Sequence, residues 1–98
     1  MPRISRHRDR CRTGHRCDGS APVLASQSEV FAEGRAILVR GNKVAPHKIK
    51  VGDFCVKHSA ILSGSSSTVF VKGIGVGRRR DRADNGSMTG AADSVSAG

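Results

Sequence analysis

The segment "TGHRCDG" (13–19) carries a histidine and a cysteine that could bind a metal ion. His15 and Cys17 lie two positions apart, between glycines that no regular element can run through. Imidazole and thiolate are both ligands of tetrahedral zinc, and a His-x-Cys step can present the two from one turn. The segment could therefore be half of a metal site, or an ordinary polar turn in a basic protein.

Two further segments offer the remaining ligands of such a site. "VAPH" (44–47) ends in His47, and "CVKH" (55–58) joins Cys55 to His58 at a Cys-x-x-His spacing. Each of these histidines, taken alone, is typical of a surface turn. However, three of the four histidines and all three cysteines lie in or beside these segments, outside the stretches of β-strand character. This clustering predicts a metal site, although the spacing is not that of a standard zinc finger.

The redox state of the cysteines follows from the expected compartment. No apolar run approaches the ~20 residues that span a membrane, and "MPRISRHRDR" is followed by no hydrophobic stretch typical of a secretion signal. We therefore expect synthesis in the cytosol, which is reducing. An odd number of cysteines in that compartment predicts that Cys11, Cys17 and Cys55 are free thiols or ligands rather than disulfides.

The composition predicts a thin hydrophobic core. The 98 residues include three phenylalanines and no tryptophan or tyrosine, so the large apolar side chains that anchor most cores are scarce. A metal crosslink is a natural supplement in so small a scaffold. Seventeen Lys and Arg against eight Asp and Glu give a net charge of +9. This charge is typical either of a protein with an anionic partner, such as nucleic acid or a lipid surface, or of charged turns that keep a thinly cored protein in solution. His7, in the basic N-terminal stretch, is expected to be solvated.

A repeat of short β hairpins extends over the middle of the chain. "SEVFAEG" (28–34) and "STVFVKG" (67–73) match at an offset of 39, and each places a β-branched residue and Phe before a glycine turn. "RAILVRG" and "IGVGRRR" follow as return strands, and we expect the closing turns at 40–42 and 79–81. A truncated copy, "DSVSAG" (93–98), ends the sequence. Such hairpins must pack against one another, because each alone is marginal in water.

These features predict one all-β domain over residues 1–98 and no enzyme. Asp9, Asp53 and Asp81 have turn-like contexts, in which Asp caps backbone N–H groups. "GSSS" lacks the strand-to-helix context of a nucleophile elbow, and "GIGVG" lacks the helix that follows a phosphate-binding loop. The domain divides into hairpin repeats at about 26–42 and 65–81 and a truncated third copy at about 89–98.

The ordered motifs "TGHRC", "VAPH", "CVKH" and "GSSSTVFVKG" resemble the PAAR-repeat proteins, in particular the short phage-type members that cap contractile tail spikes. The resemblance covers nearly the whole chain, and its specificity lies in the order of the motifs. It implies a small conical β-spike with three pseudo-equivalent faces. It also implies one structural metal ion near the vertex, zinc or alternatively iron, held by three histidines and a cysteine. By motif these ligands are His15, His47, His58 and Cys17, with Cys55 as the alternative thiolate.

The chain departs from the family pattern at several turns. The tetrapeptide that names the family is replaced by "AILV" (36–39) and "GVGR" (75–78). Arg8 and Arg80 stand where the family has glycine before Asp, and Ser96 replaces the Phe typical of the final strand. If these turns require a positive φ, each Arg costs roughly 1 kcal/mol.

The resemblance implies a structural function at the tip of a contractile injection device, namely a phage tail baseplate that pierces the host cell envelope. The implied partner is a homotrimeric β-helical central spike with one copy of this chain per trimer, and contact with the host outer membrane is transient. The expected location is the virion, after assembly in the host cytoplasm. Val30, Phe31, Val69 and Phe70 would lie at the base or in internal packing.

The alternative, from a different class, is a small zinc-dependent nucleic-acid-binding domain. The net charge of +9 and the His/Cys pairs favour it. The hairpin repeat speaks against it, because it comes without stacking aromatics or a recognition helix. We therefore expect no nucleic-acid partner.

Overall fold

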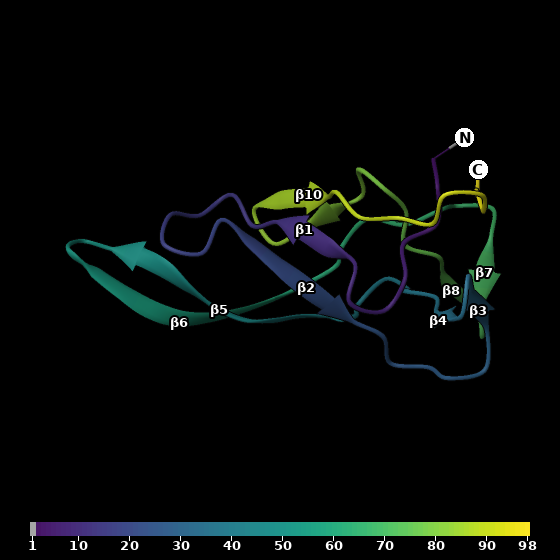
Figure 1. Ribbon diagram of the computed structural model, residues 1–98, viewed down its shortest axis with the longest axis horizontal. Coiled ribbons are helices and arrows are strands. Elements are labelled where there is room, and N and C mark those ends of the chain that lie inside the picture. The colour runs from purple at the N-terminus through teal and green to yellow at the C-terminus, as the bar shows by residue number, and fades with distance from the viewer. Residues whose placement is uncertain (1) are drawn as a thin grey trace.

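The computed structural model describes residues 2–98, and these residues form β-strands and no helix (Figure 1). The predicted all-β class is therefore confirmed. Within this part of the chain there is accordingly no helix of the length and hydropathy that a membrane crossing requires. The strands are β1 (Arg10–Arg12), β2 (Ser20–Leu24), β3 (Phe31–Ala32), β4 (Arg35–Ala36), β5 (Lys43–Val51), β6 (Phe54–Ile61), β7 (Phe70–Val71), β8 (Ile74–Gly75), β9 (Arg82–Ala83) and β10 (Gly86–Met88).

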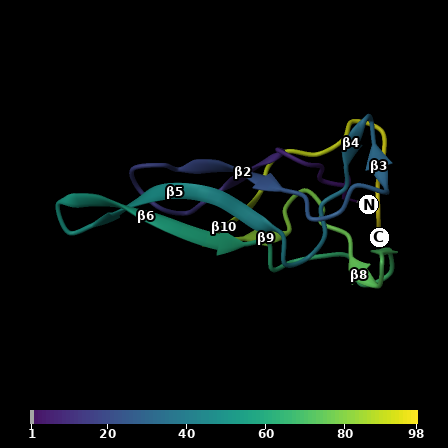
Figure 2. The ribbon, with the colours of Figure 1, turned by 90° about the horizontal axis from the view of Figure 1, so that it is seen from below.

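Six strands form one curled antiparallel sheet, in the order β6-β5-β2-β1-β10-β9. The hairpins β3-β4 and β7-β8 form two small separate sheets. The molecule is elongated, with extents of 42 × 24 × 21 Å. The tip of the β5-β6 hairpin forms one end, which we call the hairpin end, and the two small hairpins lie at the other, which we call the base (Figures 1 and 2).

The two small hairpins have the same conformation, as their offset of 39 residues in the sequence suggests. Phe31 pairs with Ala36 in β3-β4, and Phe70 pairs with Gly75 in β7-β8. In both turns φ is 51° at the first residue and 79° at the glycine that follows. The repeat in the sequence is thus a repeat in backbone structure.

The strands of these hairpins are much shorter than expected, at two residues each. Their turns lie at 33–34 and 72–73, at the glycines expected from the sequence. Residues 40–42 and 79–81 also form turns, but these turns follow the return segments, and the expectation that they close the two hairpins is wrong. The reason is that each return segment leaves its hairpin after two residues and pairs with another part of the chain. Arg6 bridges Ile37, and Val39 bridges Val76.

The two ends of the described chain form a third unit of the same kind. Arg3 bridges Ser96, as Ala36 pairs with Phe31 in β3-β4. Ile4 N donates a hydrogen bond to Val95 O at 2.8 Å. The equivalent bonds in the other two units run from Ile37 N to Val30 O and from Val76 N to Val69 O, both at 3.0 Å.

A closed ring of three backbone hydrogen bonds joins these three units. Ser5 N donates to Gly77 O (2.9 Å), Gly77 N to Leu38 O (2.8 Å), and Leu38 N to Ser5 O (3.0 Å). Ser5 and Leu38 are fully buried, and a Cβ at position 77 would lie 2.5 Å from Leu62 Cδ2. The side chain of Leu62 therefore occupies the space beside the ring that a side chain at position 77 would need.

Three equivalent turns follow the ring, each closed by an Asp or Asn side chain. The side-chain oxygen accepts a hydrogen bond from the backbone N–H three residues earlier. Asp9 and Asp81 also bind the guanidinium group of that earlier residue through two hydrogen bonds. Their predicted capping role is confirmed. The backbone bonds run from Arg6 N to Asp9 Oδ2 (2.7 Å), from Val39 N to Asn42 Oδ1 (2.8 Å) and from Arg78 N to Asp81 Oδ2 (2.8 Å).

The residue before each capping side chain has a left-handed backbone. φ is 70° at Arg8, 92° at Gly41 and 74° at Arg80. Only the middle turn has the glycine that this conformation favours, so each arginine costs roughly 1 kcal/mol. The bidentate Arg–Asp pairs lie in the two turns that lack glycine, and they offset part of that cost.

Two clusters of small side chains form the core, as thin as the composition predicts. No phenylalanine belongs to either cluster: Phe31, Phe54 and Phe70 are 54, 74 and 55% exposed. The aromatic side chains lie instead at the two ends of the molecule. One cluster, near the base, contains Ile4, Ala32, Ile37, Val39, Val71, Val76, Ala92 and Ala97, and the other, in the six-stranded sheet, contains Cys11, Ala21, Val23, Leu38, Val44, Leu62, Ala83 and Met88.

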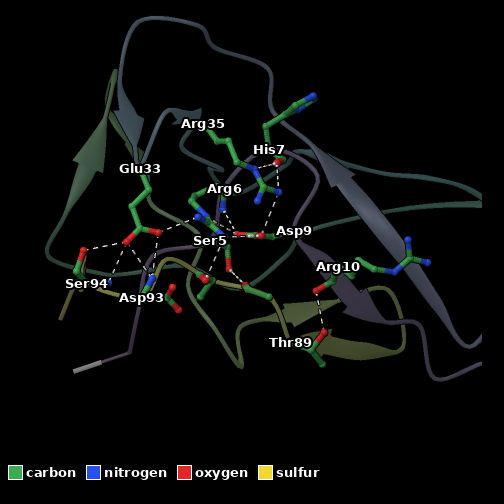
Figure 3. A network of polar contacts seen from close by, with 12 residues as sticks. Ser5, Arg6, His7, Asp9, Arg10, Glu33, Arg35, Thr89, Asp93 and Ser94 are labelled. Atoms are coloured by element: carbon green, nitrogen blue, oxygen red, sulfur yellow. Dashed lines mark hydrogen bonds and ion pairs between the residues drawn. The ribbon is translucent and has the colours of Figure 1, made fainter.

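Glu33, in the β3-β4 turn, holds the C-terminal segment in place (Figure 3). Its carboxylate accepts hydrogen bonds from Ser94 Oγ (2.9 Å) and Asp93 N (3.1 Å), and it pairs with Arg6 Nη1 (2.8 Å). The hydrogen bond from Ser94 is the main cause that lowers the pKa of Glu33 below its ordinary 4.5. The ionised carboxylate is therefore the form that stabilises this contact.

We expect Glu33→Gln to lower the free energy of unfolding at neutral pH and to have little effect in acid. Because the pKa is lowered in the folded state, the carboxylate contributes fully above its ordinary value of 4.5, and the contribution is lost as the pH falls through the folded value. Thermal unfolding at a series of pH values measures the difference. Glu29→Gln, which removes an exposed carboxylate paired with Lys72, is the matched control. A Glu33→Gln effect of equal size at all pH values would contradict this account.

Candidate metal centre

The β5-β6 hairpin places two of the predicted histidines side by side. His47 and His58 lie directly opposite each other in its register. "VAPH" and "CVKH" are therefore strand segments, and reading them as turns was wrong. The sequence does carry a signal of this hairpin, the alternation of Lys and aliphatic residues over 48–51 followed by Gly52 and Asp53.

A tight loop brings His15 to the same place. Thr13 is fully buried, and its hydroxyl accepts a hydrogen bond from His15 N at 3.2 Å. Gly14 has a φ of 75°, and a Cβ there would lie 2.2 Å from Asn85 O. Only glycine allows this loop to lie against the turn between β9 and β10. The glycine of the "TGHRC" motif therefore positions the histidine that follows it.

The three histidines converge on the carboxylate of Asp84, in the turn between β9 and β10. Nε2 of His15 and Nε2 of His58 lie 2.9 and 3.1 Å from Oδ1, and Nε2 of His47 lies 2.7 Å from Oδ2. The side chains of His47 and Asp84 are 3 and 5% exposed, and those of His15 and His58 are 22 and 30% exposed. We call these four side chains the histidine cluster. All three histidines that the sequence analysis singled out lie in it.

The hydrogen bonds of His47 determine what its second ring nitrogen can do. Nδ1 lies 2.8 Å from Ala45 O, and because a carbonyl oxygen only accepts, Nδ1 carries a proton. In neutral His47 the Nε2 lone pair would then face the carboxylate of Asp84 at 2.7 Å. A second proton on the ring, or a cation between the two groups, makes this contact favourable.

Asp84 is held in its ionised form by the histidines. Burial raises the pKa of this carboxyl, but the hydrogen bonds with His15, His58 and His47 together outweigh burial and lower it below its ordinary value. The cluster thus presents one negative charge among three imidazole rings, and that charge attracts a cation.

The donor atoms fit a metal ion chemically. His15, His58 and Asp84 each offer a ligand atom within 4.8 Å of the others, which makes them a possible metal-binding triad. His47 contacts the second oxygen of Asp84 from the buried side and has the backbone partner that metal-ligating histidines commonly have. Zinc and iron(II) both accept a donor set of imidazole nitrogens with a carboxylate oxygen.

Cys17, the predicted thiolate ligand, forms a disulfide with Cys55, the predicted alternative, with a Cα–Cα distance of 6.1 Å. A sulfur atom in a disulfide is not a thiolate, so neither cysteine can provide the predicted ligand in this structure. The expectation of free thiols is wrong for both. The two cysteines are 38 residues apart, and the predicted metal site placed both near the same histidines but not bonded to each other. The disulfide fastens the loop that carries His15 to the strand that carries His58.

Cys11 and His7 take no part in the cluster. Cys11 is a free cysteine, fully buried in the sheet core, and the loss of solvent on burial raises the pKa of its thiol. His7 is half-buried, and its Nδ1 accepts a hydrogen bond from Ala25 N at 2.9 Å. The prediction of a solvated His7 is therefore wrong.

Asp84 is the residue of the cluster that the sequence analysis missed. It lies in "RADNG" (82–86), a stretch typical of a turn, and its φ is 53°. It is 26 residues from His58 and 69 from His15, so no local spacing marks it as a partner of either. Only the folded sheet brings the three together.

No protein-family model and no curated protein matches this chain. The features that bear on its function are the histidine cluster, the disulfide and the surfaces at the two ends of the molecule.

We expect the unfolded, non-reduced chain to contain one thiol that reacts with Ellman's reagent, and the native chain to react much more slowly because Cys11 is buried. Reduction of the disulfide should lower the free energy of unfolding by about 4 kcal/mol, the value for closing a loop of this length. Denaturant unfolding with and without reductant measures it. Cys17→Ser should behave like the reduced chain in both conditions. Three reactive thiols in the unfolded, non-reduced chain would contradict the disulfide.

Proposed function

We propose that this chain is the metal-stapled tip of a contractile injection device, a phage tail baseplate, which caps the trimeric central spike and helps to pierce the host cell envelope. The resemblance to PAAR-repeat proteins supports the proposal. The function is mechanical: the chain supplies a stiff end piece on which the force of contraction is concentrated.

The observation that carries the proposal is the set of three equivalent backbone units at the base. One chain built from three such units can match a homotrimer in a ratio of one to three. Two of the units expose apolar side chains there: Val30 is 40%, Phe31 54%, Phe70 55% and Ile74 38% exposed, whereas Val69 packs against the core. Exposed apolar surface of this kind marks an interaction site. The base is thus the face that would meet the spike.

The histidine cluster supports the proposed crosslink by a metal ion. Its members come from the loop at 13–19, the β5-β6 hairpin and the β9-β10 turn, so one ion would crosslink three parts of a thinly cored protein. We infer one structural ion per chain, zinc or alternatively iron, held by His15, His47, His58 and Asp84. Such an ion, when bound, supplies coordination bonds whose free energy adds to that of folding.

The disulfide supports a place of action outside the reducing cytosol. Disulfides persist mainly in oxidising surroundings, including virion surfaces. A tip assembled in the host cytoplasm would complete the Cys17–Cys55 bond after the particle is released.

We expect the purified full-length chain to carry about one zinc or iron ion, and Asp84→Ala to lose it. Elemental mass spectrometry measures the metal, and unfolding with and without a chelator measures its effect. At a free metal concentration about a thousand times Kd, the ion adds about 4 kcal/mol to the free energy of unfolding.

Cys17→Ala is the matched control for this experiment, because it removes the disulfide and leaves the four ligands in place. It should keep the metal. Metal lost in Cys17→Ala but kept in Asp84→Ala would show that the proposed ligands are wrong. A folded chain without metal would show that the fold needs no metal crosslink.

We expect co-expression with a homotrimeric β-helical phage spike to give a complex with one copy of this chain per trimer, measured by native mass spectrometry. Phe31→Asp combined with Phe70→Asp should abolish the complex, because a charged group at the base would have to be buried unpaired. Phe54→Asp, at the hairpin end, is the control and should leave it intact. Full binding by the double variant would rule out the base as the contact face.

A further inference from the structure

The outer part of the β5-β6 hairpin, residues 48–57, is a ribbon that extends to the hairpin end (Figures 1 and 2). The loop at 13–19 lies along its inner part, where Cys17 bridges Ile49, and the ribbon is two-stranded beyond that point. Its turn is Gly52-Asp53, with a φ of 60° at the glycine, and residues 50–57 are all exposed. Directly opposite side chains of such a ribbon share one side, and neighbours along a strand alternate between sides. The register therefore sorts its residues into two sets.

One side of the ribbon is apolar. Ile49 lies opposite Val56, and Val51 lies opposite Phe54. Val51, Phe54 and Val56 are 53, 74 and 41% exposed, and none of them belongs to a core cluster. Leaving this surface in water costs free energy in the isolated chain.

The other side of the ribbon is cationic. It carries Lys48, Lys50 and Lys57, all exposed, and Lys48 lies directly opposite Lys57. Cys55, opposite Lys50, is on the same side, and its disulfide with Cys17 joins this side to the loop at 13–19. Like charges at opposite positions of a ribbon repel and destabilise it. Two features of the ribbon thus raise the free energy of the isolated chain: its exposed apolar side and its pair of opposite lysines.

We propose that this ribbon inserts into the surface of an anionic lipid bilayer, with its apolar side among the upper acyl chains and its lysines at the headgroup phosphates. This deepens the function proposed above and rests on it, since it names the surface that the tip meets. The bilayer relieves both costs at once, because it covers the apolar side and neutralises the lysines. Insertion is shallow, because the unpaired backbone groups at the ribbon edges need water or headgroups.

The shape of the ribbon favours a bilayer over a second protein molecule. A stable interface buries about 1,600 Å² in total, and four apolar side chains on a narrow ribbon supply only a small part of that area. The ribbon also lies at the opposite end of the molecule from the base, so it stays free when the base is covered.

The experiment is a sedimentation assay of the full-length chain with vesicles of phosphatidylglycerol and phosphatidylcholine, and with vesicles of phosphatidylcholine alone. We expect binding to the anionic vesicles that weakens as salt is added. Phe54→Ser should weaken it about tenfold, because the most exposed phenylalanine no longer enters the bilayer. The variant in which Lys48, Lys50 and Lys57 are all changed to Glu should lose the preference for anionic lipid.

The base provides the matched control. Phe31→Ser combined with Phe70→Ser removes two side chains of similar exposure, 54 and 55%, from the other end and should leave vesicle binding unchanged. A second readout uses the lack of tryptophan in the sequence. Phe54→Trp should show a blue shift of its fluorescence on adding anionic vesicles, and Phe70→Trp should show none.

Three results would overturn the proposal. They are equal binding to both kinds of vesicle, loss of binding in the base variant but not in Phe54→Ser, and self-association of the chain through the ribbon without vesicle binding. If any of them is found while the chain still carries its metal and joins the trimeric spike, the membrane contact is wrong and the proposed function stands. If metal and spike binding also fail, the proposed function falls with it.

Discussion

The structure depends on the ring of backbone hydrogen bonds among Ser5, Leu38 and Gly77. These bonds join the N-terminal segment to the two hairpin repeats, so the position of each unit is set by the other two. Ser5 and Leu38 are fully buried at the ring, and the glycine at position 77 leaves room for the buried side chain of Leu62. From the ring, three capped turns direct the chain toward the six-stranded sheet, and two of them do so through arginines with a strained backbone.

Along β5 the surroundings of the side chains change from apolar core to polar contacts and then to solvent. Val44 is buried in the aliphatic core, His47 is buried against a carboxylate, and Val51 is 53% exposed. The protein does not have enough apolar volume to extend its core over this length. Ionic contacts, a disulfide and the donor atoms for a metal lie where the core ends, which is where a thinly cored fold most needs a crosslink.

The phenylalanines also lie outside the core. A protein with three aromatic side chains places none of them in its core: two lie at the base and the third at the hairpin end. Aromatic groups have the largest apolar surface to contribute to a contact. Their placement therefore marks the two ends, and not the sides, as the surfaces with which this molecule meets its surroundings.

The sequence by itself determined the all-β class, the offset of 39 residues between the two hairpins, the thin core and the grouping of His15, His47 and His58. Each of these follows from residue type and local spacing, which the chain carries in any conformation. The tertiary structure decided the rest: that Asp84 joins the histidines, that Cys17 pairs with Cys55, and that the chain ends form the third unit. Those contacts join residues 26 to 93 positions apart, and no local pattern records them. They exist because the sheet and the ring bring the segments together, and only the folded backbone specifies which segments meet.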